Sequence, residues 1–124
     1  MTNERDLSRF TMGLAKLAEV DGTVGEDVVA PLGDLGRYIV EFAFGDIYRR
    51  EGLGLREREI ATVAMLTVLG RETQLRVHIN AALNVGLSAG EIEEVIIQTV
   101  PYAGFPTAIN AVNLLKSVVS DTPG

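Results

Sequence analysis

The residue best suited to proton chemistry in this chain is His78, the only histidine among 124 residues. It lies in RETQLRVHINAALNVG, residues 71–86, where apolar residues recur at helical spacing. Side chains three, four and seven positions apart share one face of a helix, so we expect Arg71, Gln74 and His78 to line up. Three polar groups on an otherwise apolar helix favour a functional site. The alternative is a core histidine, hydrogen-bonded to a carbonyl or a carboxylate.

Glu59 is the carboxylate best placed to act on this imidazole. It directly precedes the apolar run of REREIATVAML, residues 56–66, so its side chain is positioned to point toward the core. If that helix packs against the next one, Glu59 reaches His78 and favours the imidazolium, a usable acid near neutral pH. The alternative is that Glu57 and Glu59 stand there because carboxylates are favoured in the first turn of a helix.

Arg50 and Tyr102 are further candidates for binding a substrate. Arg50 follows Arg49 at the end of an aromatic stretch, where it either binds an anion or is solvated at a helix end. Tyr102 lies between Pro101 and Gly104 and is either a packing residue or a hydroxyl at the mouth of a pocket.

Composition removes several classes of function. The chain has no cysteine, which excludes disulfides and thiol redox chemistry, and a single histidine argues against a zinc site. A net charge of −6 without a Lys/Arg cluster argues against nucleic-acid binding. No apolar run is long enough to span a bilayer, and MTNERDLSRF lacks the apolar region of a signal peptide. We therefore expect a soluble, cytoplasmic protein without a membrane segment.

All periodic segments predict helices, so we expect an all-α fold of about six helices in one domain, residues 1–124. The first helix, within residues 1–22, ends at the turn DGTVG. One or two helices follow Pro31, depending on whether Gly45 breaks them. The remaining helices are expected over 56–69, which carries apolar residues on more than one face and should be central, over 71–85, over 89–100 and from about 106. Ser88 and Glu91 form a capping box, Gly86 suits a helix C-terminus, and Pro101 marks an end or a kink.

The run from Leu55 to Leu115 resembles the carboxymuconolactone decarboxylase family, whose all-helical fold is shared with alkylhydroperoxidase-D-like (AhpD-like) proteins. The segments that carry the resemblance are REREIATVAML, LRVHINAALNVGLSAGEIEEVIIQ and YAGFPTAINAV. The most specific of them is the His-x-x-x-Ala-Leu-Asn-x-Gly pattern at 78–86, and FGDIYRREGL at 44–53 is a weaker N-terminal part.

The resemblance implies two possible branches. In the peroxidase-like branch, a glutamate, a Cys-x-x-Cys pair and a histidine form a redox relay; Glu59 and His78 match the outer two positions. Arg71 and Gln74 stand where the cysteines would be, so the chain resembles the cysteine-free decarboxylase branch and not a thiol peroxidase or disulfide reductase. Many members of that branch have a glutamate where this chain has Gln74, which leaves the substrate open.

The decarboxylase branch implies a cofactor-free carboxy-lyase of aromatic compound catabolism. Its namesake converts 4-carboxymuconolactone to 3-oxoadipate enol-lactone and CO2. Loss of CO2 sends electrons through the alkene into the lactone carbonyl, so the substrate is its own electron sink. The protein orients the carboxylate, stabilises the oxyanion and delivers one proton to the α-carbon. We predict His78 as proton donor and Glu59 as the residue that tunes it; the predicted partners of a small carboxylic acid or lactone are Arg71, Gln74, Arg50 and Tyr102.

The resemblance also implies a homo-oligomer, a trimer or a hexamer, in which the helix within residues 1–22 is a possible contact arm. Two other functions stay open. One is an isomerase or cyclase that moves protons on a polar ring compound with the same His78, an alternative kept open by Gln74. The other is a non-catalytic helical oligomer that binds a small ligand, because a scaffold does not fix a function.

Overall fold

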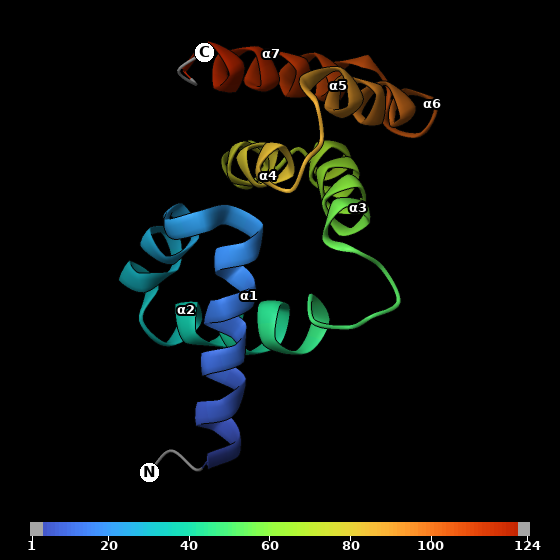
Figure 1. Cartoon of the computed structure of the whole chain (residues 1–124). Coiled ribbons are helices and arrows are strands. Elements are labelled where there is room, and N and C mark those ends of the chain that lie inside the picture. The colour runs from blue at the N-terminus through green and yellow to red at the C-terminus, as the bar shows by residue number, and fades with distance from the viewer. Residues whose placement is uncertain (1–3, 122–124) are drawn as a thin grey trace. The chain divides into compact units, whose positions relative to one another are not determined.

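Figure 1 shows the computed structural model, which describes residues 4–121. Within this range all regular elements are helical, which confirms the predicted all-α class. The N-terminal elements are α1 (Glu4–Val29), the 3-10 turn η1 (Ala30–Leu32), α2 (Asp34–Tyr38) and the π-helix η2 (Ile39–Ile47). They are followed by α3 (Leu55–Leu69), α4 (Glu72–Asn84), α5 (Ala89–Gln98), α6 (Val100–Ala103) and α7 (Phe105–Asp121).

The chain divides into two compact units, residues 1–55 and 56–124, and each is described by itself. The prediction of one domain over residues 1–124 stays a prediction. None of the helices within residues 4–121 combines the length and the apolar character needed to cross a membrane.

In the first unit, α1 crosses α2 and η2 (Figure 1), and glycines permit a close approach of the backbones. A Cβ atom on Gly13 of α1 would lie 2.1 Å from the carbonyl oxygen of Val40 in η2. A Cβ atom on Gly45 of η2 would lie 2.9 Å from the carbonyl oxygen of Arg9. Both positions therefore require glycine for this packing.

A buried carboxylate accompanies this contact. The side chain of Glu41 in η2 is largely buried; its Oε1 lies 3.2 Å from Nε of Arg37 and its Oε2 3.9 Å from Nη1 of Arg9. Nη2 of Arg9 also donates to Oδ2 of Asp46 at 2.6 Å. Since a charge removed from water must be paired, the two arginines compensate the burial of Glu41.

One predicted break in this unit is only partly observed, and the alternative left open at Gly45 is decided. The first helix does turn at Asp21 and Gly22, where Gly22 adopts φ 59°, but helix resumes as far as Val29. Gly45 does not interrupt the second segment, because α2 passes directly into a π-helix that includes it. The local sequence shows the position of Gly45, whereas the backbone conformation there also depends on the close packing against α1.

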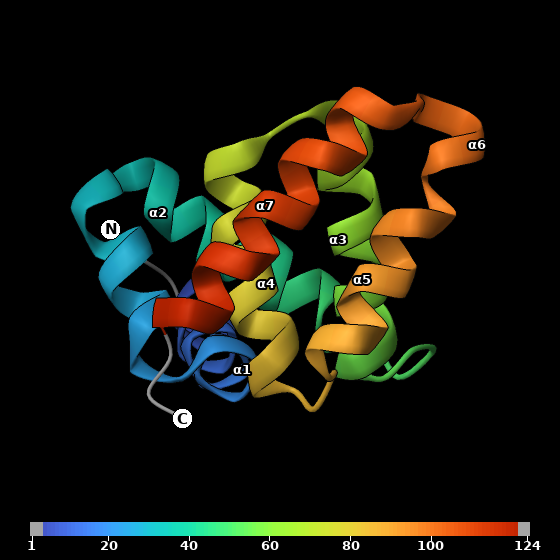
Figure 2. The same cartoon turned by 90° about the horizontal axis from the view of Figure 1, so that it is seen from above.

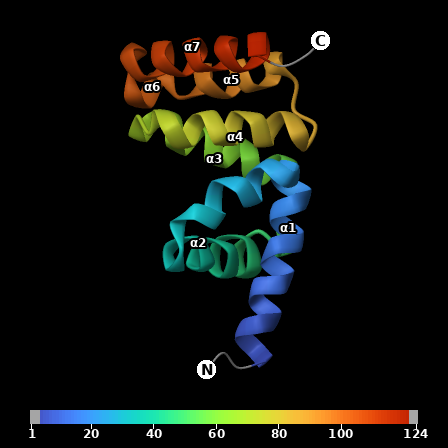
Figure 3. The ribbon, with the colours of Figure 1, turned by 90° about the vertical axis from the view of Figure 1, so that its left-hand side faces the viewer.

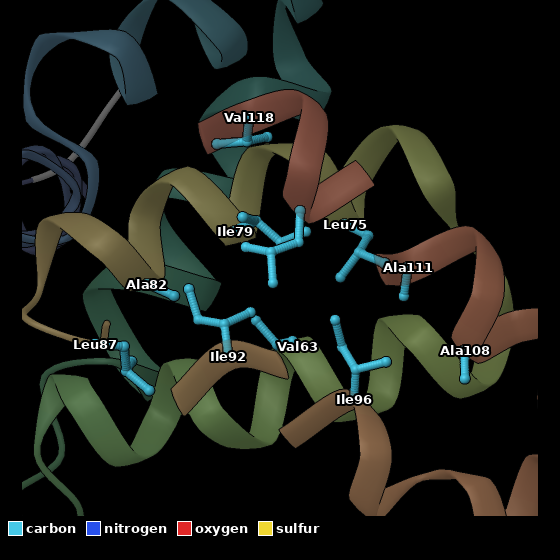
Figure 4. Packing of buried hydrophobic residues seen from close by; sticks show 11 residues of the cluster. Val63, Leu75, Ile79, Ala82, Leu87, Ile92, Ile96, Ala108, Ala111 and Val118 are labelled. Atoms are coloured by element: carbon cyan, nitrogen blue, oxygen red, sulfur yellow. The ribbon is translucent and has the colours of Figure 1, made fainter. Parts of the chain in front are cut away.

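In the second unit, α7 packs on both α4 and α5 (Figures 2 and 3). Apolar side chains from four helices, α3, α4, α5 and α7, form one buried cluster (Figure 4). The cluster consists of Val63 from α3, Leu75, Ile79 and Ala82 from α4, Leu87, Ile92 and Ile96 in or before α5, and Ala108, Ala111, Leu115 and Val118 from α7.

The capping box predicted at the start of α5 is confirmed. The backbone N–H of Glu91 donates to Oγ of Ser88, and the backbone N–H of Ser88 donates to Oε1 of Glu91, both at 3.0 Å. Glu91 also forms an ion pair with Arg56 in the first turn of α3. The hydrogen bond from the Ser88 backbone, with help from the Arg56 charge and against a smaller effect of desolvation, lowers the pKa of Glu91 below its ordinary value.

The helix ends in this unit follow the predicted residues. Gly86 has φ 105° just after α4, and Pro101 stands in the first turn of α6, so α5 ends before it. The central position predicted for α3 stays a prediction. In the second unit α3 contributes Val63 to the apolar cluster, while its Met65 and Leu69 are 56% and 64% exposed.

Candidate active site

The site predicted around His78 lies on a helical hairpin. A two-residue connection, Gly70 and Arg71, joins α3 to α4. Gly70 adopts φ 69°, its N–H donates to the carbonyl of Thr67, and the N–H of Arg71 donates to the carbonyl of Leu66, each at 3.1 Å. So short a connection returns α4 alongside α3. Residues that are far apart in the sequence, one on each helix, are thereby brought together.

Glu59 and His78 meet across this hairpin. Oε2 of Glu59 lies 2.9 Å from Nδ1 of His78, which confirms the predicted approach of the two side chains. Glu59 has no exposed surface, whereas the His78 side chain is 22% exposed. The carboxylate is thus inside the protein, and the imidazole lies at the boundary with solvent.

This geometry divides the roles of the two imidazole nitrogens. A polar group without exposed surface is costly unless it has a hydrogen-bond partner, and Nδ1 of His78 supplies one for Glu59. Nε2 lies on the ring edge away from this contact.

The face of α4 that carries His78 runs from solvent into the core. Arg71 precedes the first turn and Gln74 lies within it, and both are exposed. His78 follows one turn after Gln74, and Ala81 and Ala82 beyond it are buried. The predicted stripe therefore exists, with the imidazole at its solvent boundary. The substrate-binding roles of Arg71 and Gln74 stay predictions.

The other two candidates are both exposed side chains. Arg50 is exposed and belongs to the unit of residues 1–55. Tyr102 is 81% exposed on α6, which packs on α5 and α7, so it is not a packing residue within the described chain. Within residues 4–121, no three or more His, Asp or Glu side chains gather in a way that could hold a metal ion.

Sequence reasoning missed two features of α3. Arg56, in the first turn, ties this helix to the capping box of α5 through Glu91, one turn before Glu59. Thr67, two turns after Glu59 on the same buried face, has no hydrogen-bond partner for its hydroxyl among the described residues. A threonine within an apolar run was the available signal for Thr67, but the pairing of residues 56 and 91 depends on tertiary packing.

Residues 33–117, more than two thirds of the chain, match the model of the carboxymuconolactone decarboxylase family. The chain belongs to this family. The match includes the helical hairpin with Glu59 and His78 and agrees with the resemblance found in the sequence. Residues 1–32, which hold α1, lie outside the match.

Similar proteins include a 4-carboxymuconolactone decarboxylase from Acinetobacter baylyi, 36% identical over 88 residues, which are 71% of this chain and 66% of the relative. An uncharacterised 15.0 kDa protein from Paracoccus denitrificans is 34% identical over 67% of this chain and 63% of its own length. A nitrosuccinic acid decarboxylase from Metarhizium robertsii is 28% identical over 67% of this chain and 58% of its own length. The aligned region thus spans less than two thirds of each relative.

Proposed function

We propose that this protein is a cofactor-free decarboxylase of a small carboxylated lactone similar to 4-carboxymuconolactone, with His78 as the proton donor. The observation that carries the proposal is the 2.9 Å contact between Nδ1 of His78 and the fully buried carboxylate of Glu59. Membership of the family and the names of two relatives support a carboxy-lyase.

The substrates named for these two relatives share one chemical feature. In 4-carboxymuconolactone, the electrons released with CO2 move into an unsaturated lactone carbonyl. In nitrosuccinic acid, the corresponding electrons move into a nitro group on the same carbon. Each reaction leaves an anion whose charge rests largely on oxygen and which is then protonated on carbon. A proton donor held at one position is therefore the common requirement, and an imidazole beside a buried carboxylate meets it.

In this proposal each candidate residue has a separate task. His78 delivers the proton to the α-carbon through Nε2, and Glu59 positions the ring and stabilises its protonated form. The exposed guanidinium of Arg71, just before α4, and the exposed amide of Gln74, in the first turn of α4, bind the substrate carboxylate or the developing oxyanion. Arg50 and Tyr102 are proposed as further substrate contacts. Gln74 stands where many members of this branch have a glutamate, so the substrate of this chain is expected to differ from theirs at the group that contacts this position.

We also propose that the chain works as a homo-oligomer, a trimer or a hexamer. Large apolar side chains are exposed on the second unit, among them Leu69, Tyr102 and Phe105. Extensive apolar surface of this kind is typical of protein interfaces.

The direct test is CO2 release from 4-carboxymuconolactone by the wild type and by His78→Gln, at equal concentrations. The variant is expected to lose about 10²-fold or more of the rate, the usual contribution of a general acid. Circular dichroism and sedimentation check that it folds and assembles as the wild type does. Absence of CO2 release from the wild type removes this substrate, and equal rates in both proteins remove the role of His78.

A further inference from the structure

We infer that a pocket within the unit of residues 1–55 binds a small organic cation, a primary amine with an apolar body. The pocket has a volume of about 250 Å³ and lies between α1, the η1 turn and the segment formed by α2 and η2. The inference does not depend on the proposed function, because the substrate proposed there is an anion. It concerns a second ligand of the opposite charge.

The pocket exists because α1 bends. Asp21 and Gly22 leave helical geometry, and helix then resumes as far as Val29. After this bend the chain returns toward α2, so that α1 contacts both η1 and α2 (Figure 1). A Cβ atom on Gly36 of α2 would lie 2.1 Å from the carbonyl oxygen of Val29, so the two walls approach closely at this point. The hollow is therefore enclosed by backbone that is packed together.

Apolar side chains offer a surface for the body of the ligand. Phe10 and Leu14 of α1 line the pocket and are partly exposed. Val29 and Val40 also line it and are buried. Ligand pockets are usually lined in this way, by apolar and aromatic side chains with a few polar groups that fix the orientation of the ligand.

Two carboxylates determine the charge of the ligand. Glu26 and Asp34 both line the pocket, and neither side chain has an ion pair or hydrogen bond within the described residues 4–121. Arg37 carries the positive charge among the described lining residues, but its Nε lies 3.2 Å from Oε1 of the buried Glu41. The negative charges of the pocket thus remain uncompensated and favour a cation over a neutral or anionic molecule of the same shape. An alkylammonium group has three N–H donors and can serve both carboxylates.

Membership of the family does not supply this pocket. Residues 1–32 lie outside the region that matches the family model. They contribute four of the lining side chains described above, Phe10, Leu14, Glu26 and Val29. The ligand is therefore inferred from the residues of this chain alone.

The test compares three probes that share a phenylethyl body. They are 2-phenylethylamine, a cation at neutral pH, 2-phenylethanol, which is neutral, and 3-phenylpropanoate, an anion. Titration of the ¹⁵N-labelled full chain, followed by nuclear magnetic resonance, gives the Kd and identifies the amides that shift. We expect saturable binding of the amine with a Kd of about 1 mM or less, and the largest shifts within residues 26–40. The other two probes are expected to bind about tenfold more weakly or worse.

Variants at the two carboxylates test the charge of the pocket. Glu26→Gln and Asp34→Asn each remove one charge with little change of shape, and each is expected to weaken binding of the amine by about threefold. A matched control is Asp27→Asn, which removes an exposed carboxylate next to Glu26 that does not line the pocket. This variant is expected to bind as the wild type does. Circular dichroism checks that all three variants fold.

Weaker binding in both pocket variants, with Asp27→Asn unchanged, supports the inference. Equal weakening by Asp27→Asn overturns it, because the net negative charge of the protein then accounts for the binding. Equal affinities for the three probes, shifts confined to residues 56–124, or no binding of the amine also overturn it. Assays of CO2 release, which depend on His78, are separate measurements, so failure of either proposal leaves the other intact.

Discussion

Glu59 carries a carboxyl group with no exposed surface, and this group contacts Nδ1 of His78. We predict that Glu59→Gln folds and assembles as the wild type does, since glutamine has the same size and its amide oxygen can still accept a hydrogen bond from Nδ1. The negative charge that stabilises the protonated ring is lost. The rate of decarboxylation is expected to fall by about 10²-fold, with little change in KM. Measurement of kcat and KM over a range of pH tests this prediction.

A matched control distinguishes the effect of Glu59 from a general effect of removing a carboxylate. The fall in kcat is expected for Glu59→Gln and not for Glu94→Gln, which removes an exposed carboxylate far along the sequence. If Glu59→Gln keeps the wild-type rate, Glu59 has no role beyond packing.

Glu59 and His78 were predictable as candidate residues from local patterns in two consecutive helices, but their contact depends on how these helices pack and was expected only on that condition. Each side chain stands at the edge of an apolar stripe, and Gly70 marks where the chain reverses. The exposure of Tyr102 was not predictable. A tyrosine between Pro101 and Gly104 suits a packed turn and an open one equally well, and only the arrangement of α6 on α5 and α7 separates the two.

At the scale of elements, the contact between α1 and η2 depends on a glycine. A Cβ atom on Gly13 would lie 2.1 Å from the backbone oxygen of Val40, and backbone cannot move aside as a side chain does. We predict that Gly13→Ala lowers the free energy of unfolding by about 1–3 kcal/mol, the usual cost of overpacking. Urea unfolding followed by circular dichroism, at one fixed protein concentration, measures the change.

Gly90 in α5 provides the matched control. The nearest atom to a Cβ at this position would be Oγ of Ser88 at 3.8 Å, an ordinary contact distance. The same substitution, Gly90→Ala, is therefore expected to leave stability unchanged or to raise it by up to about 1 kcal/mol, because alanine favours helix. Gly13→Ala and Gly90→Ala of equal stability would contradict the requirement for close backbone approach.

The elements whose ends depend on local chemistry were the most predictable. The capping box at Ser88 and the proline after α5 act through neighbouring backbone groups, so the sequence indicates them directly. The π-helix η2 was not foreseen. Gly45 allows either a break or a wide turn, and the approach of Arg9 in α1 selects the wide turn.

At the scale of the whole molecule, many large apolar side chains of the described chain are exposed. The sequence is 47% hydrophobic, and α3 carries apolar residues on more than one face, of which Met65 and Leu69 are largely exposed. A groove of about 390 Å³ between α5 and α7 is lined almost entirely by apolar residues, with Asn113 the one polar side chain. Burial of such side chains in an interface contributes about 1.5–3 kcal/mol each, which favours self-association.

The proposed homo-oligomer can be tested at this groove. Phe105, at the start of α7, is 69% exposed and lines it. Phe105→Glu would bring an unpaired charge into an apolar interface, so we predict that sedimentation shifts from a trimer or hexamer toward the 13.3 kDa monomer. Lys116→Gln changes the net charge by the same amount on an exposed part of α7 outside the groove, and it is expected to assemble normally. A wild type that stays monomeric at all concentrations contradicts the proposal. An oligomer unaffected by Phe105→Glu leaves self-association intact and moves its interface away from α5 and α7.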